Sequence, residues 1–293
     1  MKIRLLLVCL VTIYCFDGQA QPALETDIWL ADVRIKEGNI YFGAAKNVTN
    51  SKAYDNQPFF LNDSTLLYTH IGDDLQADIY QYQLQKKTNA KFTSTTESEY
   101  SAKLLPNKKG ISVVEVEKDS TQRIWSFDLN GKNGKVLIPK IDSVGYYVWL
   151  SDTTFAAFIL TEPSSLQIGS STGFKTKTIA QNIGRCMQVN SFGNLYFTML
   201  ATDSVRWLCR TEQNGSITKL IEFYKGVEDF AISNNNIVFS AKEGTIYYSD
   251  HQFNLGWRVC GNFGAMGVNN INRLALSPDN KRMALVNMIE SKK

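Results

Sequence analysis

The alternation of apolar and polar positions along the chain forms one pattern that recurs six times. Each copy is an apolar strand, a tight polar turn and a second, more hydrophobic strand, and the copies begin near residues 57, 101, 146, 186, 228 and 271. The turns are rich in Asn, Asp, Gly and Ser, which tolerate hairpin dihedral angles. The copies are spaced by roughly 39–46 residues, the period of a four-stranded propeller blade.

A second hairpin follows most copies. Its first strand carries a short signature that ends in an aromatic residue, as in Asp78-Ile79-Tyr80, Arg123-Ile124-Trp125, Val205-Arg206-Trp207 and Thr245-Ile246-Tyr247. Two hairpins make four antiparallel strands, which is one blade of a radial repeat. The pattern therefore predicts an all-β fold, a six-bladed β-propeller of four-stranded antiparallel blades.

The two ends of the repeat complement one another. The sixth copy lacks a second hairpin, whereas residues 27–33 and 38–49 form two strands that have no inner pair of their own. We expect these N-terminal strands to complete the last blade beside the hairpin at 274–286. This pairing would close the ring and remove two exposed sheet edges, which otherwise favour aggregation.

The repeat resembles that of the TolB-like propellers. The segments that carry the resemblance are DNQPFFLNDSTLLYT from Asp55, ADIYQYQL from Ala77 and LALSPDNKRMALV from Leu274. The resemblance implies a six-bladed propeller and says more about fold than about function. TolB itself has an additional N-terminal α/β domain, but strand patterns here begin within ten residues of the expected cleavage site. We therefore expect a stand-alone propeller, and the similar stand-alone propellers serve as docking surfaces in the Gram-negative envelope.

The N-terminus has the pattern of a secretory signal. Lys2 and Arg4 precede an apolar run over residues 5–16, which is too short to span a bilayer, and small residues follow at Gly18 and Ala20. We predict cleavage after Ala20, a mature propeller domain over residues 21–293 with no transmembrane segment, and a periplasmic or secreted location. The alternative is a lipid anchor on Cys15, which the bulky residue before that cysteine disfavours.

Composition narrows the set of partners. The chain is 44% hydrophobic, and removal of residues 1–20 lowers its net charge from +3 to +2, without any basic cluster. Nucleic acid is therefore not expected as a partner. Three cysteines remain after cleavage, Cys186, Cys209 and Cys260. An odd number cannot form a complete disulfide framework, and we expect free thiols.

Candidate catalytic motifs are scarce. Gly169–Gly173 matches the G-x-S-x-G nucleophile elbow, but β-strand patterns flank it, and we expect a hairpin turn instead. The chain has two histidines, His70 and His251, in different blades. Metal and nucleophilic sites usually recruit more imidazoles or thiolates than this chain offers. We predict no catalytic residue, no metal site and no cofactor.

The loops that lead into the inner strands are the expected functional site, because they meet at one mouth of the central channel. Their charged, amide and aromatic residues include Asp55, Gln57, Glu99, Tyr100, Tyr146, Tyr147, Arg185, Glu228, Asn270 and Arg273. Tyrosine and arginine often carry binding energy at interfaces. We expect this mouth to bind a protein or peptide partner.

The alternative is a carbohydrate-active glycosidase or lyase that uses carboxylates and tyrosines at the same mouth to act on a glycan. Two carboxylates with a basic residue inside the channel would favour the enzyme. A lining of apolar and amide side chains would favour the binding protein.

Overall fold

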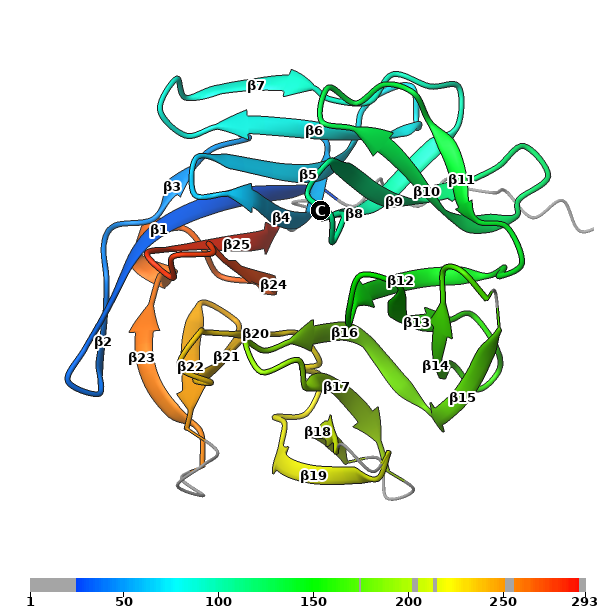
Figure 1. The fold of residues 1–293 in the computed structure, drawn as a ribbon. Helices are drawn as coiled ribbons and strands as arrows, with labels where there is room; N and C mark the ends of the chain where they lie inside the picture. The colour runs from blue at the N-terminus through cyan, green and yellow to red at the C-terminus, as the bar shows by residue number, and fades with distance from the viewer. Residues whose placement is uncertain (1–24, 174, 202–204, 213–214, 251–255, 290–293) are drawn as a thin grey trace, which may run out of the picture.

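The computed structural model describes residues 25–173, 175–201, 205–212, 215–250 and 256–289 (Figure 1). Its strands are arranged in fans around a common centre, and the helical structure within these ranges is one 3-10 turn, Gly264–Met266. No helix in the described ranges is long and apolar enough to cross a membrane. The predicted signal segment and its cleavage site lie outside the described residues.

Five blades follow one another along the chain as four-stranded antiparallel units. The first blade consists of β4 (Tyr54–Asn62), β5 (Thr65–Ile71), β6 (Ala77–Gln83) and β7 (Thr88–Lys91). The second consists of β8 (Ser98–Leu104), β9 (Gly110–Val116), β10 (Gln122–Asp128) and β11 (Lys135–Ile138). The third consists of β12 (Val144–Trp149), β13 (Thr154–Ile159), β14 (Ser165–Ser170) and β15 (Thr176–Gln181). The fourth consists of β16 (Ile183–Val189), β17 (Leu195–Leu200), β18 (Arg206–Thr211) and β19 (Ile217–Glu222). The fifth is β20 (Phe230–Ile232), β21 (Val238–Lys242), β22 (Thr245–Ser249), β23 (Arg258–Asn262).

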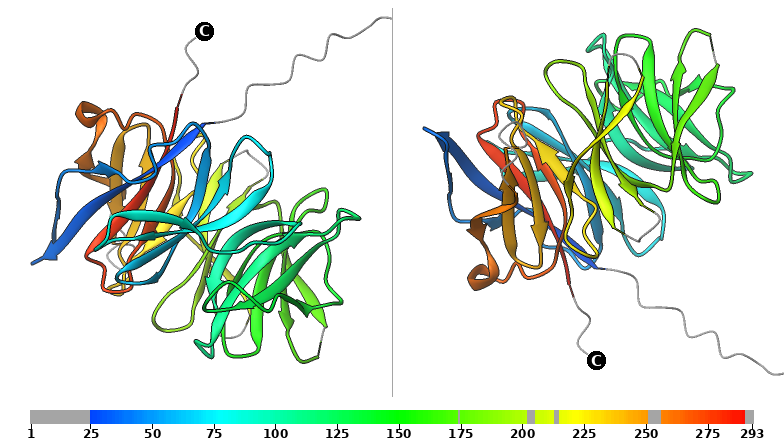
Figure 2. Two further views of the ribbon diagram at one scale, coloured as in Figure 1. Left: turned by 90° about the horizontal axis from the view of Figure 1, so that it is seen from above. Right: turned by 90° about the horizontal axis from the view of Figure 1, so that it is seen from below.

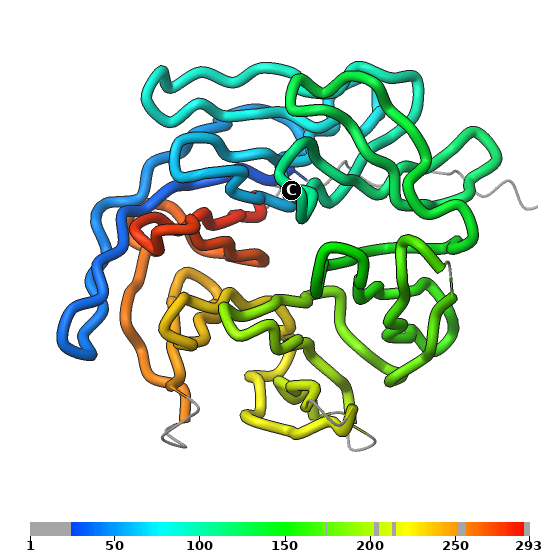
Figure 3. The backbone as a smooth tube through the Cα atoms, viewed as in Figure 1, coloured from blue at the N-terminus to red at the C-terminus, as the bar shows by residue number. Residues whose placement is uncertain are grey.

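The sixth blade combines the two ends of the chain, as predicted. Its inner pair is β24 (Ile271–Leu276) and β25 (Arg282–Met288), and β1 (Thr26–Lys36) pairs with β25 over seven residues, from Thr26 opposite Met288 to Asp32 opposite Arg282. Figure 3 shows this N-terminal strand beside the C-terminal one. The outermost position is divided between β2 (Asn39–Phe42) and β3 (Lys46–Asn47), both paired with β1.

The β1–β2 hairpin extends beyond the body of the propeller, as Figure 2 shows. At the other end of β1, a parallel bridge between Thr26 and Tyr54 links this blade to the first, so the two blades form one nine-stranded sheet.

Hydrophobic clusters join neighbouring blades. One packs Leu67 of the first blade against Ile111 of the second, another packs Val114 of the second against Phe155 of the third. The fourth and fifth blades meet at Tyr196 and Phe230. Further clusters lie between the third and fourth, the fifth and sixth, and the sixth and first blades. The second strand of a blade is covered on both faces by this packing, which explains why it is the more hydrophobic one in the sequence repeat.

The structure also tests the predictions for the G-x-S-x-G match and for the three cysteines. Gly169–Gly173 spans the end of β14 and the turn before β15, so the G-x-S-x-G match lies on a hairpin as expected. Cys186 lies on β16 and Cys209 on β18, with β17 between them, and Cys260 lies on β23. All three are free thiols.

Candidate binding site at the channel mouth

Bulges in the inner strands shape the mouth of the channel. Five of the six inner strands shift register against the next strand near their first residues, between Asn56/Phe59, Tyr100/Lys103, Val144/Tyr146, Ile183/Met187 and Ile271/Arg273. A bulge adds a residue to one strand and re-aims its side chains. The predicted mouth loops are therefore shorter than expected. Eight of the ten predicted residues lie within inner strands, and only Glu228 and Asn270 precede one.

Gln57 and Ser101 occupy equivalent bulges and join the first two blades. Both have positive φ, 56° and 55°. The Gln57 Oε1 atom accepts hydrogen bonds from the Ser101 backbone N–H at 2.7 Å and from the Ser101 and Thr69 hydroxyls at 3.1 Å each. Three donors on one oxygen fix the orientation of this amide at the channel.

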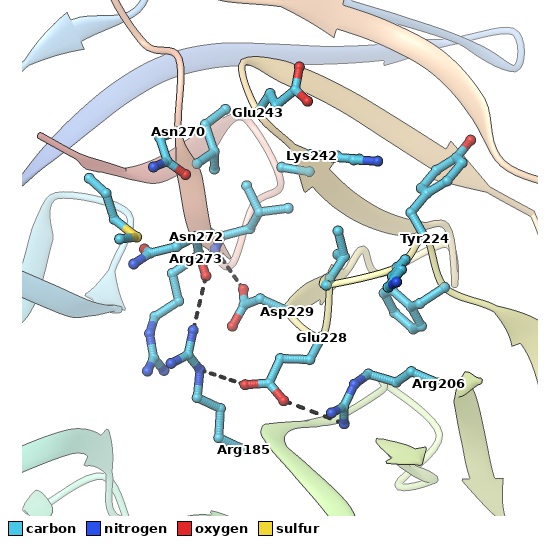
Figure 4. Close-up of a pocket in the computed structure, with 18 of the residues that line it drawn as sticks. Arg185, Arg206, Tyr224, Glu228, Asp229, Lys242, Glu243, Asn270, Asn272 and Arg273 are labelled. Carbon is cyan, nitrogen blue, oxygen red and sulfur yellow. Dashed lines mark hydrogen bonds and ion pairs between the residues drawn. The ribbon is translucent and has the colours of Figure 1, made fainter. Parts of the chain in front are cut away.

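An arginine–glutamate network spans the fourth and fifth blades. Glu228, just before β20, lies between two arginines, with Oε1 3.1 Å from Arg185 Nε and Oε2 3.4 Å from Arg206 Nη1 (Figure 4). Arg185 also donates a hydrogen bond at 3.4 Å to the backbone oxygen of Asn272, in the sixth blade's inner strand β24. The three charged side chains are a quarter to a third exposed, so the network faces the open mouth.

Asp229 points into the protein from the same loop. Its carboxylate accepts a hydrogen bond at 2.8 Å from the backbone N–H of Leu274, and the residue is 7% exposed. Burial raises the pKa of Asp229 to about 6, although Arg273 and Arg185 oppose this effect. The carboxyl group therefore changes charge near neutral pH.

Arg273 and Tyr146 form a pair across the channel. Arg273 Nη2 donates a hydrogen bond to the Tyr146 hydroxyl at 3.1 Å, and the guanidinium carbon lies 5.1 Å from the centre of the tyrosine ring. Arg273 is 9% exposed, and its Nε atom is buried with no hydrogen-bond partner among the described residues. An unpartnered donor of this kind is costly unless a ligand or water satisfies it.

Lys103 and Cys186 lie deeper in the channel. Lys103 Nζ is 5.0 Å from the centre of the Phe59 ring, and burial, with a contribution from Arg273, lowers the pKa of this lysine to about 8. The Cys186 thiol contacts the backbone oxygen of Phe230 at 3.2 Å, and burial raises the pKa of this thiol. A thiol held in its neutral form is a poor nucleophile.

Two cavities open among these residues. The outer cavity, about 970 Å³, lies between the fourth, fifth and sixth blades and is lined by Arg185, Arg206, Glu228, Asn270 and Arg273, among others (Figure 4). The inner cavity, about 50 Å³, receives residues from all six blades. Arg185, Asp229, Arg273 and Leu274 line both. The structure thus brings together Gln57, Tyr146, Arg185, Glu228, Asn270 and Arg273 of the predicted residues.

The side chains of the remaining predicted residues are placed elsewhere. Tyr147 lines the inner cavity, but the residue is only 1% exposed and its hydroxyl donates a hydrogen bond at 2.7 Å to Ser112 in the second blade, so its side chain belongs to the core between blades. Asp55 is also buried, 2.7 Å from the His70 imidazole. Tyr100 packs partly against the core between the second and third blades, and Glu99 is fully buried. Strand alternation explains the outcome, because neighbouring residues on a strand face opposite sides.

Glu99 belongs to a buried pair of carboxyl groups. It lies opposite Glu115 on paired strands β8 and β9, and it accepts hydrogen bonds from the Thr93 and Thr95 hydroxyls. Glu115 is 3% exposed, and its Oε2 atom has no hydrogen-bond partner among the described residues. Burial raises the pKa of Glu99 to about 7 and, with repulsion from Glu99, that of Glu115 to about 8. Both carboxyl groups are therefore partly or mostly protonated at neutral pH.

The charged residues of the mouth that were not predicted as site residues include Lys103, Arg206 and Asp229. The signal for Lys103 was a lysine within an apolar inner strand, and Asp229 directly follows Glu228. No group of three His, Cys, Asp or Glu residues in the described part of the chain is arranged to hold a metal ion.

Comparisons with known proteins agree on the fold. Neither a scan of protein-family models nor a search of curated proteins finds a match. A candidate TolB structure from Agrobacterium tumefaciens superposes with a TM-score of 0.70 at 11% identity, over 92% of this chain and 100% of that one. A gluconolactonase from Xanthomonas campestris gives 0.63 at 7% identity, over 92% and 99%. A nidogen/laminin complex gives 0.65 at 12% identity, over 86% and 98%.

The chain therefore has the TolB-like propeller fold that its repeat resembles. Identities this low establish the fold alone, and the same architecture is found in proteins with different functions.

Proposed function

We propose that this propeller is a non-catalytic binding protein that holds a protein or peptide partner at the channel mouth, in the bacterial periplasm or outside the cell. The observation that carries the proposal is the convergence of Tyr146, Arg185, Glu228 and Arg273, from four blades, on cavities that open to the surface. Concave sites with a few convergent polar groups are the usual places of ligand binding. The predicted signal segment, residues 1–20, supports the location.

The proposal is tested by peptide selection. A library of linear peptides displayed with free C-termini is selected on the immobilised mature chain, and an enriched peptide is then titrated against variants. Arg185→Ala should weaken binding at least about tenfold, or about 1.4 kcal/mol, because it removes a cation from the mouth.

Arg210→Ala is the matched control. Arg210 lies in the same blade and is likewise paired with a glutamate, Glu212 at 2.7 Å, but it lines neither cavity of the mouth. This variant should bind as the unchanged chain does. Equal losses in both variants, or no peptide enriched above the bare surface, would refute the proposal.

A carbohydrate-active propeller is the second candidate. Glu228 and Asp229 lie beside Arg185 and Arg273, which is the combination of carboxylates and cations that such an enzyme requires, and a gluconolactonase shares the fold. However, both Glu228 oxygens face arginines within 3.4 Å, and Asp229 is buried against the backbone N–H of Leu274. Neither carboxylate is free to approach a sugar without a rearrangement, which favours the binding protein.

Turnover decides between the two candidates. The mature chain is incubated with a panel of aryl glycosides, polyuronates and aldonolactones, and Glu228→Gln is the comparison variant. No turnover is expected. Turnover that Glu228→Gln abolishes would favour the enzyme.

A further inference from the structure

Two cationic side chains at the inner cavity have no ion pair. Lys103 and Arg273 both line this cavity, and neither has a carboxylate oxygen within 4.0 Å among the described residues. Arg273 is more than nine-tenths buried, and its Nε atom lacks a hydrogen-bond partner there. By contrast, Arg185, at the entrance of the cavity, is already paired with Glu228.

The acidic residues do not balance these cations. Among the described residues that line the inner cavity, Asp229 is the acidic one, and the backbone N–H of Leu274 already occupies one of its oxygens. Buried charge without a partner is unfavourable, because little water is present to solvate it. The cavity is therefore electropositive, and an anion bound in it would compensate the excess charge.

Size and shape indicate the kind of anion. The inner cavity, about 50 Å³, is far smaller than the outer one, about 970 Å³, so it admits a small group only. A planar carboxylate is smaller than a tetrahedral phosphate and suits this space better, and the Arg273 guanidinium can pair with its oxygens. Hydrogen-bond donors on Gln57 and Tyr146 face the same space.

The two cavities together suggest how a larger ligand would lie. They share Arg185, Asp229, Arg273 and Leu274, so a group in the inner cavity connects directly to a body in the outer one. We infer that the inner cavity binds a carboxylate between Lys103 and Arg273, and that the rest of the ligand occupies the outer cavity. The inference rests on the proposed binding function, because it concerns the same mouth.

The test compares acids with their neutral counterparts. The enriched peptide is synthesised as the free acid and as the C-terminal amide, and glucuronate is paired with glucose to represent a sugar acid. Affinities are measured by calorimetry or by NMR chemical-shift titration of the mature chain. In at least one pair the acid should bind tenfold or more tightly than its neutral counterpart, and which pair responds identifies the source of the carboxylate.

Lys103→Met is the diagnostic variant, since it keeps an unbranched side chain of similar length but removes the charge. It should reduce the ratio of acid to neutral affinity at least fivefold. Lys219→Met is the control, because Lys219 also lies over an aromatic ring, 5.4 Å from the centre of Trp207, but on an outer strand. It should leave the ratio unchanged.

The outcomes separate this inference from the proposed function. A peptide that binds equally as acid and amide, with no preference for glucuronate over glucose, overturns the carboxylate site but leaves the binding function standing. Glucuronate binding without any peptide ligand supports the site and argues against a peptide partner. Inorganic phosphate that displaces the acid at lower concentration than acetate also overturns the inference. If Lys103→Met does not fold, the acid-to-neutral ratio of the unchanged chain still decides.

Discussion

The buried carboxyl pair Glu99 and Glu115 in the second blade makes stability depend on pH, and Glu115→Gln should reveal this dependence. The folded chain raises the pKa of Glu115 from 4.5 to about 8. A raised pKa contributes stability that is complete below the unfolded value and is lost as the pH rises through the folded value. The protein should therefore become less stable between about pH 4.5 and pH 8, and a glutamine, which does not ionise, should remove this loss.

The magnitude follows from the two pKa values. At 1.36 kcal/mol for each pKa unit, the penalty on Glu115 is about 4 kcal/mol at pH 8 and less than about 1 kcal/mol at pH 5. Since Glu115 is 3% exposed, solvent screens little of this penalty. Glu115→Gln should thus raise the melting temperature by about 8 °C at pH 8 and by about 2 °C or less at pH 5. Thermal unfolding followed by circular dichroism at both pH values measures the difference.

Glu117→Gln is the matched control, because Glu117 lies just after the end of β9, two residues from Glu115. Glu117 accepts a hydrogen bond from Arg123 Nε at 2.7 Å and one from Trp125 Nε1 at 2.9 Å, and Arg123 lowers its pKa. The same substitution should therefore lower stability at pH 8. An equal gain for Glu115→Gln at both pH values, or no gain at pH 8, would refute the reasoning.

Three further predictions concern other parts of the chain. Tyr147→Ala should cost about 3–5 kcal/mol in urea unfolding, because the side chain fills the core between two blades; a loss below about 1 kcal/mol would contradict its buried position. Gly131→Ala should lower the free energy of unfolding by about 2 kcal/mol or more, because φ is 71° and a Cβ atom would collide with the Phe92 carbonyl oxygen. Gly38→Ala, at a position with φ of 76° and open space around it, should lower it by about 1 kcal/mol. Intact-mass analysis of exported protein should find Gln21 at the N-terminus, and a lipid adduct would contradict the predicted cleavage.

The fold was predictable because its signals are local and repeated. Each blade carries its own apolar strands and polar turns, and the missing hairpin of the last blade showed where residues 27–49 belong. The pairing of β1 with β25 confirms that expectation. The sequence did not show that β1 also bridges to β4, because a single contact between Thr26 and Tyr54 leaves no periodic pattern.

The site was predictable only in part, because bulges decide which residue faces the channel. Tyr146 and Tyr147 are adjacent and alike in the sequence, but one contacts Arg273 and the other Ser112 in a neighbouring blade. A shift of one residue reverses the face on which a side chain lies. Pro58, Gly145 and Gly184 lie in three of these bulges, but they do not fix the register of the residues that follow. Lys103 was missed for the same reason, since its strand resembles an ordinary buried one.

The pairing of β1 with β25 also determines when the protein can finish folding. Roughly 250 residues separate the two strands along the chain, so at a synthesis rate of about 5–20 residues per second β1 waits some 12–50 s for its partner. During that time a strand containing Trp29 and Ile28 has an open edge, which favours association with other strands. A chain cut before Arg282 never receives the partner at all. The last blade can therefore form only after β25 has been synthesised. Prematurely terminated chains should aggregate or be degraded rather than persist as five-bladed molecules.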